Sequence, residues 1–306
     1  MFRIPSLLIS VLAISCLFPV STTGQTLDFE DLQQTELAVQ PSNAILWQID
    51  RGDLVRPSYI MGIIRLMPHD HFFLPPTLSQ YLNTTDKLVM EIDPLEGDVA
   101  HLHRGNLPID STLDIILPKK QLETISTFFT DSLSPSAYEA LLDRYSPNQV
   151  TRIMMTDYCL GWESGREPVN VELYLRNAIE KPFKGLNTFW ARTNWNDSHS
   201  IQRQVDNFVG QFNHRKTSCQ YYDAMLNAYR KQDLDLVALL SKSAPDLGDN
   251  MGRKVVERND EWLSSLIWHL QYESLFIAVQ APQLPGEDGL LHRLRKAGFT
   301  VTPIFE

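Results

Sequence analysis

The sequence lacks an excess of basic residues. Lysine and arginine together number 27, against 37 aspartates and glutamates, and the formal net charge is -10 at pH 7. A protein that binds nucleic acid needs a basic face, and an acidic chain is repelled by anionic membrane surfaces. The charge balance therefore argues against nucleic acid and against anionic lipid as partners.

Long apolar runs are also scarce, and the one that stands out extends from Leu7 to Val20. It follows Arg3 and precedes the small residues Ser21-Thr22-Thr23-Gly24, which is the pattern of a secretory signal peptide. A spanning helix needs roughly 20 apolar residues, so an uncleaved anchor fits less well. We expect a signal peptide over residues 1–24 and an exported chain, periplasmic or extracellular, with no integral membrane span after cleavage.

Cysteines are few, since the chain has 3. Cys16 follows Ala13-Ile14-Ser15, which resembles a lipobox with alanine in place of leucine, so we favour cleavage over a lipoprotein. Cys159 and Cys219 remain, and two cysteines of an exported chain can pair. A bond between them would close a loop of about 60 residues, worth roughly 4 kcal/mol. The alternative is two unpaired, half-buried thiols.

The hydrophobic pattern predicts strands near both ends of the chain. Residues 25–43 are polar without a clear period, and we expect them to form a tether. Two apolar runs flank the turn residues Asp50 to Asp53 and predict a hairpin. The expected strands cover residues 44–49, 58–64, 87–92, 182–186, 274–281 and 299–305.

The middle of the chain, residues 117–271, is mostly helical in pattern. A further helix is expected to open at Pro285-Gly286-Glu287-Asp288, with acids in its first turn, and to end at Ala297-Gly298. The fold class is therefore α/β. We expect one domain over residues 44–306, with a mixed sheet flanked by helices and a large helical insertion.

Polar residues follow several of these strands. Gly62 interrupts an apolar run that ends in Arg65, and a glycine inside a strand often marks the close approach of a backbone or a ligand. Glu91 and Asp93 share one side of an extended segment. In α/β sheets ligands gather beyond the carboxyl ends of strands. We therefore expect one pocket, formed with the strand-end residues Asn187, Gln283 and Gly286 and with Arg258-Asn259 of a long helix.

These motifs, taken in order, resemble the TraB/GumN family, which includes the Tiki-type metalloproteases. The matching segments span nearly the whole mature chain. They are Ile45-Leu46-Trp47, Pro57 to Arg65, Glu91-Ile92-Asp93, Lys184 to Thr188, Arg258 to Trp262, and Gln280 to Leu291 followed by Gly298 to Pro303. The resemblance implies a metal-dependent peptidase fold, with Glu91, Arg258 and Asn259 at positions of the family's catalytic set.

The sequence departs from the family where the metal chemistry is expected. The resemblance implies a histidine in each of two Gly-x-x-His motifs, and Arg65 and Gln283 stand at those positions. Asn187 replaces a glutamate of the same set. A guanidinium has no lone pair for a metal, whereas catalytic sites typically use three ligands from imidazole, thiolate or carboxylate. We therefore hypothesise a degenerate metallohydrolase site with no cofactor, in a protein with a binding or structural role.

Two roles remain open for Arg65. It could neutralise Glu91 through a bidentate contact and so fill the old pocket, or it could bind an acidic or peptide ligand together with Arg258. The alternative function is an active metal-dependent peptidase or hydrolase, with Zn or Mn on a relocated ligand set. His69-Asp70-His71 and His101-Leu102-His103 are the candidates for such a set, although a solvated loop explains both pairs better.

Overall fold

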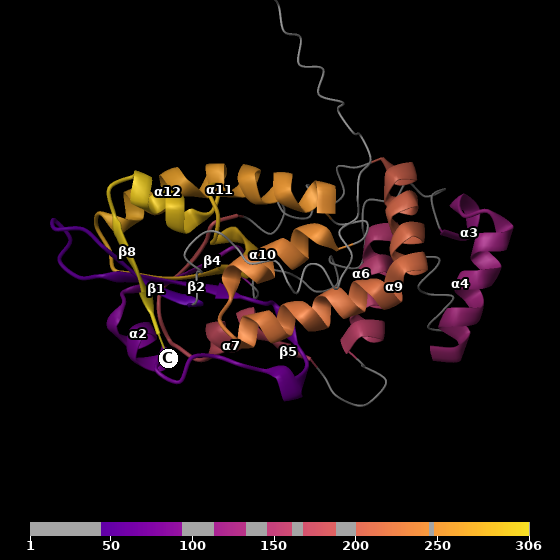
Figure 1. The fold of residues 1–306 in the computed structure, drawn as a ribbon, viewed down its shortest axis with the longest axis horizontal. Coiled ribbons are helices and arrows are strands. Elements are labelled where there is room, and N and C mark those ends of the chain that lie inside the picture. Colours follow the sequence, from indigo (N-terminus) through magenta and orange to yellow (C-terminus); the bar gives the residue numbers. More distant parts are fainter. Residues whose placement is uncertain are drawn as a thin grey trace, which may run out of the picture.

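The computed structural model describes residues 44–93, 113–132, 146–160, 168–187, 200–244 and 248–305 (Figure 1). The predicted signal peptide and tether, the His101–His103 pair and Thr188 lie outside these residues. Among the described helices, none combines the length and the apolar character needed to cross a membrane.

A six-stranded mixed sheet is the centre of the fold, in the order β6-β4-β7-β2-β1-β8. The hairpin partners β1 and β2 are antiparallel, and β8 is antiparallel to β1 on its other side. The strands β2, β7, β4 and β6 are mutually parallel. Their bounds are β1 Leu46–Asp50, β2 Ser58–Ile63, β4 Lys87–Met90, β6 Phe183–Gly185, β7 Leu275–Gln280 and β8 Thr300–Ile304. The expected mixed sheet from both ends of the chain is confirmed.

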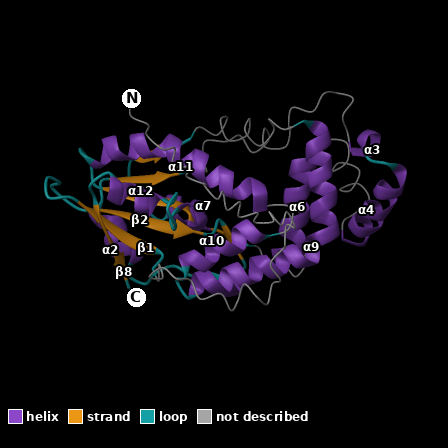
Figure 2. Cartoon of the chain, turned by 45° about the horizontal axis from the view of Figure 1, so that its top comes forward, coloured by secondary structure: helices purple, strands orange, loops and turns teal. Residues whose placement is uncertain are grey.

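Burial explains why the inner strands are continuously apolar. All six residues of β2 are buried, as are the first five of β7, because strands covered on both faces do not need an alternating pattern. Figure 1 shows the helices α11 (Gly248–Leu270) and α12 (Leu290–Lys296) along one face of the sheet and α2 (Leu78–Thr84) on the other. The turned view in Figure 2 shows the same layers.

Part of the helical middle extends away from the sheet (Figure 1), and part of it packs against the core around the sheet. Its helices are α3 (Leu113–Ile116), α4 (Lys119–Ser132), α6 (Pro147–Leu160), α7 (Val171–Asn177), α9 (Ile201–Arg230) and α10 (Leu234–Ser243). Residues of α3, α4, α6 and α9 form a second apolar cluster, separate from the core around the sheet. A disulfide joins Cys159 of α6 to Cys219 of α9. Of the two alternatives given for these cysteines, the structure therefore has the disulfide and not the free thiols.

Some boundaries differ from the prediction. The helix expected at residue 285 begins only at Leu290, after Gly289, so Glu287 and Asp288 precede the helix instead of occupying its first turn. Gly286 adopts a φ of 82°, which allows the chain to turn there, and Gly298 ends the helix at a φ of 90°, as expected. A small second sheet was not predicted: β3 (Leu66–Met67) pairs with β5 (Val169–Asn170).

Candidate functional site

Four parallel strands end at the same edge of the sheet. Gly62 of β2 is level with Val279 of β7, and Met90 of β4 is level with both Ala278 and Gly185. The residues just beyond these ends therefore meet, as expected for ligand sites in α/β sheets. Arg65, Glu91 and Asn187 follow β2, β4 and β6 in this way, and Gln280 is the last residue of β7.

Glu91 is the central acid of this edge and is only 1% exposed. Its Oε1 accepts a hydrogen bond from the backbone N–H of Gln280 at 3.1 Å. Its Oε2 lies 4.0 Å from Nη2 of Arg65 and 3.8 Å from Nη1 of Arg258. One buried carboxylate thus faces two guanidinium groups, which supply the charge compensation that a buried acid requires.

A second buried acid, Glu172, was missed by the sequence analysis. Its Oε2 lies 2.9 Å from Nε of Arg65, and its Oε1 accepts a hydrogen bond from Nη2 at 3.2 Å. Gln280 donates to the same Oε1 through Nε2 at 3.4 Å. Arg65 therefore has Glu172 as its nearest partner, and the predicted contact with Glu91 is the longer of the two.

Local structure explains how Glu172 reaches the site. Asn170 caps α7 by accepting a hydrogen bond from the backbone N–H of Leu173 at 3.0 Å, which places Glu172 in the first turn, where the helix dipole favours acids. The backbone N–H of Val171 donates to the carbonyl of Arg65 at 2.8 Å. The asparagine cap followed by an acid is a local signal, but the pairing of β3 with β5 that carries it to Arg65 is not visible in the sequence.

The four ionised groups balance one another. Glu91 and Glu172 oppose Arg65 and Arg258, so the cluster has no formal net charge when all four are ionised. Burial raises the pKa of Glu172, Arg65 acts against that shift, and the neighbouring Glu91 adds to it. We call these four residues the ion-pair cluster.

Two further predicted residues lie beside the cluster. Asp93 pairs with Arg176 of α7 at 3.6 Å. The side-chain oxygen of Asn187 accepts a hydrogen bond from Nε1 of Trp262 at 3.1 Å, and its backbone N–H donates to the carbonyl of Glu91 at 2.8 Å. Asn187 therefore ties the end of β6 to α11 and to the residue after β4.

Asn259 holds the segment that follows β7. Its Nδ2 donates to the carbonyls of Gln283 and Asp288, at 3.0 and 2.8 Å. Gln283 closes the short helix η4 (Ala281–Gln283), and its side chain is buried. The Oδ1 of Asn259 and the Oε1 of Gln283 are buried and have no hydrogen-bond partner among the described residues. Asn259 of α11, next to Arg258, thus holds the loop that contains Gln283 and the Gly286 turn.

Gly62 meets the backbone of this same loop. A Cβ added there would lie 3.0 Å from Cα of Ala281 and 3.0 Å from Cδ1 of Leu284. Tyr229 of α9 donates a hydrogen bond to the carbonyl of Gly62 at 2.9 Å. The close approach that the glycine indicated is therefore made by the chain's own η4 segment.

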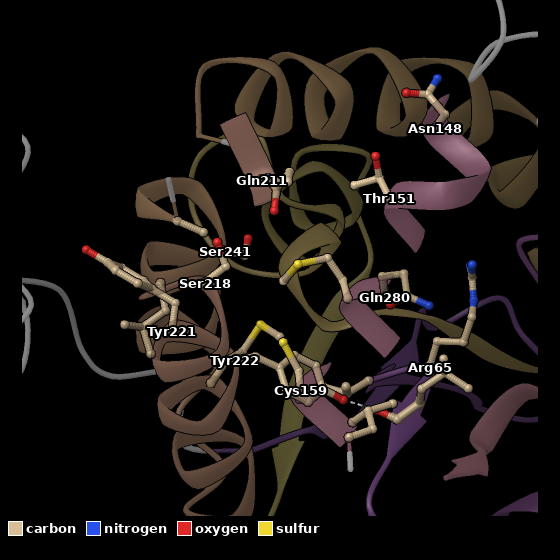
Figure 3. Close-up of a pocket in the computed structure, with 17 residues that line it drawn as sticks. Arg65, Asn148, Thr151, Cys159, Gln211, Ser218, Tyr221, Tyr222, Ser241 and Gln280 are labelled. Atoms are coloured by element: carbon tan, nitrogen blue, oxygen red, sulfur yellow. Dashed lines mark hydrogen bonds between the residues drawn. The ribbon is translucent and has the colours of Figure 1, made fainter. Parts of the chain in front are cut away.

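A cavity of about 490 Å³ lies next to the ion-pair cluster (Figure 3). Its walls come from α6, α9 and α10 and from the residues after β2. Of the sequence-predicted site residues, Arg65 alone lines it, and Gln280 is the other lining residue at the sheet edge. The predicted residues therefore do not line one open pocket together. Arg65, Glu91 and Arg258 pack against one another, and of these three Arg65 borders the cavity.

The described residues at this edge of the sheet do not fit a divalent metal. Among the described residues, no three histidine, cysteine, aspartate or glutamate side chains are grouped to hold one. A cation bound to Oε2 of Glu91 would lie close to the guanidinium groups of Arg65 and Arg258, and like charges repel. His69 and His71 lie apart from the cluster on the short helix η1 (His69–His71), where His69 is exposed.

The chain matches a known protein family. The model of the TraB/PrgY/gumN family matches residues 45–303, nearly the whole chain. The chain belongs to this family. No curated protein and no solved structure matches it.

Proposed function

We propose that this is an exported TraB/PrgY/gumN-family protein whose metallohydrolase site has been replaced by an ion-pair cluster, and that its role is binding or structural. The observation that carries the proposal is the position of Arg65. Its guanidinium lies within 4.0 Å of Glu91 and 2.9 Å of Glu172. The positive charge that a metal would bring to these carboxylates is thus supplied by a side chain.

The chemistry of the remaining groups supports the proposal. A guanidinium stays protonated and cannot coordinate a metal, and the two cluster acids already have two cationic partners. Arg65 is already paired with Glu91 and Glu172. This favours a pocket closed by ion pairs over a site in which Arg65 and Arg258 bind an acidic ligand. Asn259, which the family resemblance places in the catalytic set, donates both of its described hydrogen bonds to backbone carbonyls.

Export is the second part of the proposal. The disulfide between Cys159 and Cys219 supports it, because disulfides persist mainly in oxidising compartments. The signal-peptide pattern of residues 1–24 points to the same compartment. Expression with the leader, followed by N-terminal sequencing of the envelope fraction, tests both the cleavage and the location.

Metal analysis of the purified mature protein tests the loss of the metal site. Mass spectrometry of the metal content, after incubation with Zn²⁺ or Mn²⁺ and gel filtration, should find well under one equivalent. Glu91→Gln is the matched control, and it should give the same background value as the wild type. Stoichiometric metal in the wild type that is lost in Glu91→Gln would overturn the proposal.

Peptide cleavage tests the absence of catalysis. The folded protein should leave a peptide library intact, with and without added Zn²⁺ or Mn²⁺. Cleavage that is abolished by a chelator and by Glu91→Gln would establish the alternative, a metal-dependent peptidase.

A further inference from the structure

The cavity beside the ion-pair cluster has the size of a small-molecule site. Its volume of about 490 Å³ falls within the range of roughly 300–1,000 Å³ found for ligand pockets. Its walls are mainly apolar and include Ile64, Met155, Leu160, Tyr221, Met225 and Leu240. Such walls favour an apolar ligand body, because burying it removes apolar surface from water.

Polar residues lie at several places along these walls, Asn148, Thr151 and Gln211 among them. Figure 3 shows Arg65 and Gln280 on one side of the cavity, and Ser218 with Ser241 on the opposite side. Ser218 is 5% exposed, and its hydroxyl has no hydrogen-bond partner among the described residues. An unpaired buried hydroxyl is costly, so a group from a ligand would satisfy it. Ser241, in contrast, donates to the carbonyl of Ala238 at 3.3 Å.

Arg65 lines the cavity, and the ion-pair cluster to which it belongs has no formal net charge when its four groups are ionised. The contacts of Arg65 with the glutamates use Nε and Nη2, and none of the contacts found among the described residues uses Nη1. A ligand carboxylate placed here would join Glu91 and Glu172, and like charges in a poorly solvated site repel strongly. A neutral carbonyl can accept a hydrogen bond from Arg65 without that cost.

We propose that this cavity binds a neutral ligand with an apolar body, a carbonyl directed to Arg65 and Gln280, and a second hydrogen-bonding group directed to Ser218. The inference rests on the proposed function in one respect, which is that Arg65 is paired with glutamates. Binding is therefore measured in the presence of EDTA. A metal-dependent peptidase activity and a failure to bind ligand are then separate results.

Methionine methyl groups give a direct readout of the cavity. Met155 and Met225 line it, whereas Met61 and Met90 are fully buried in the sheet and serve as internal controls. Straight-chain alkanamides should shift the methyl resonances of Met155 and Met225 and leave the controls in place. Alkanoates of equal length should bind about tenfold more weakly at neutral pH, because of the added negative charge.

Variants locate the ligand within the cavity. Met225→Trp should fill the space and abolish the alkanamide-induced shift at Met155. Asn227→Trp places the same side chain at an exposed position of α9 and should retain binding. An ω-hydroxy alkanamide of suitable length should bind about fivefold more tightly than the plain amide, the value of one hydrogen bond. Ser218→Ala should remove that difference, and Ser241→Ala should keep it.

Three results would overturn the inference. The first is the absence of any shift at Met155 and Met225 with all of these probes, while thermal unfolding shows a folded protein. The second is alkanoate binding as tight as alkanamide binding, which would assign the cavity to an anionic ligand. The third is unchanged binding in Met225→Trp, which would place the ligand elsewhere.

Discussion

Nε of Arg65 lies 2.9 Å from Oε2 of Glu172, although the two residues are 107 positions apart in the chain. Glu172 is almost fully buried, whereas 31% of the Arg65 side chain is exposed. The buried charge of Glu172 therefore needs Arg65 for compensation, whereas solvent compensates part of the charge of Arg65. Removing the cation should cost more than removing an ordinary surface charge.

Arg65→Met tests this dependence. The substitution leaves Glu172 and Glu91 without their shared cation, and we expect a loss of about 3 kcal/mol in the free energy of unfolding. That is the low end for a broken buried pair, because Arg65 is partly solvated. Urea denaturation measures it. Arg56→Met removes the cation from an exposed pair with Asp86 and should cost less than about 1 kcal/mol.

The double variant Arg65→Met, Glu172→Met extends this test. It should recover much of the loss, since no uncompensated charge remains at Glu172. A double variant that is as unstable as the sum of both single changes would show that the two residues act independently.

The raised pKa of Glu172 should make the free energy of unfolding depend on pH. Its pKa is raised above the ordinary value of 4.5, so above that pH the folded state holds a proton that the unfolded state has lost. The contribution of Glu172 to stability is therefore greatest at low pH and declines as pH rises from about 4.5 through the raised pKa. Unfolding of the wild type and of Glu172→Gln, compared across pH, isolates this contribution.

Glu273 is the control, because its pKa is shifted in the direction opposite to that of Glu172. Lys87 lowers its pKa, and His269 contributes in the same direction. Its contribution is present above pH 4.5 and is lost as pH falls through the lowered pKa. As pH falls, the stability advantage of the wild type over Glu273→Gln should therefore shrink. Over the same fall in pH, the stability of the wild type relative to Glu172→Gln should increase. Parallel slopes for the two variants would contradict the assignment.

Gly62→Ala should destabilise the fold. The new methyl group would press on Cα of Ala281 and on Leu284, and overpacking of this kind typically costs about 1–3 kcal/mol. Gly52 has nothing within 4 Å of an added Cβ, so Gly52→Ala should be close to neutral. Thermal unfolding compares the two variants. Equal stability of both would mean that the η4 segment can move away from β2.

Removing the disulfide should weaken the link between α6 and α9. The bond closes a loop over a separation of 60 residues, and a loop of that length corresponds to roughly 4 kcal/mol in the chain-entropy model. The double variant Cys159→Ala, Cys219→Ala should show this loss in urea denaturation. Alkylation of the wild type without reductant should label neither cysteine, and labelling of both would show that the bond is not formed.

The sequence predicted the sheet better than the ion-pair cluster. Apolar runs such as Ser58–Ile63 and Leu275–Gln280 identify buried strands directly, and the strand-end rule brought Arg65 and Glu91 together correctly. Glu172 was missed because its position depends on the two-residue pairing of β3 with β5, which is too short to leave a periodic pattern. The late start of α12 was missed because the Gly286 turn and Gly289 delay a helix whose acids suggested an earlier one.

The central position of β7 has a consequence for how the chain folds. β7 lies between β2 and β4, yet its residue Leu275 pairs with Lys87 of β4 across a separation of 188 residues. Until residues 275–280 have been synthesised, β2 lacks a parallel neighbour and β4 has β6 alone, and such long-range pairing forms slowly. Completion of the sheet therefore waits until β8, at Thr300–Ile304, has been made. A chain that stays open until then would suit the export proposed above, because an unfolded chain can pass through a translocation channel.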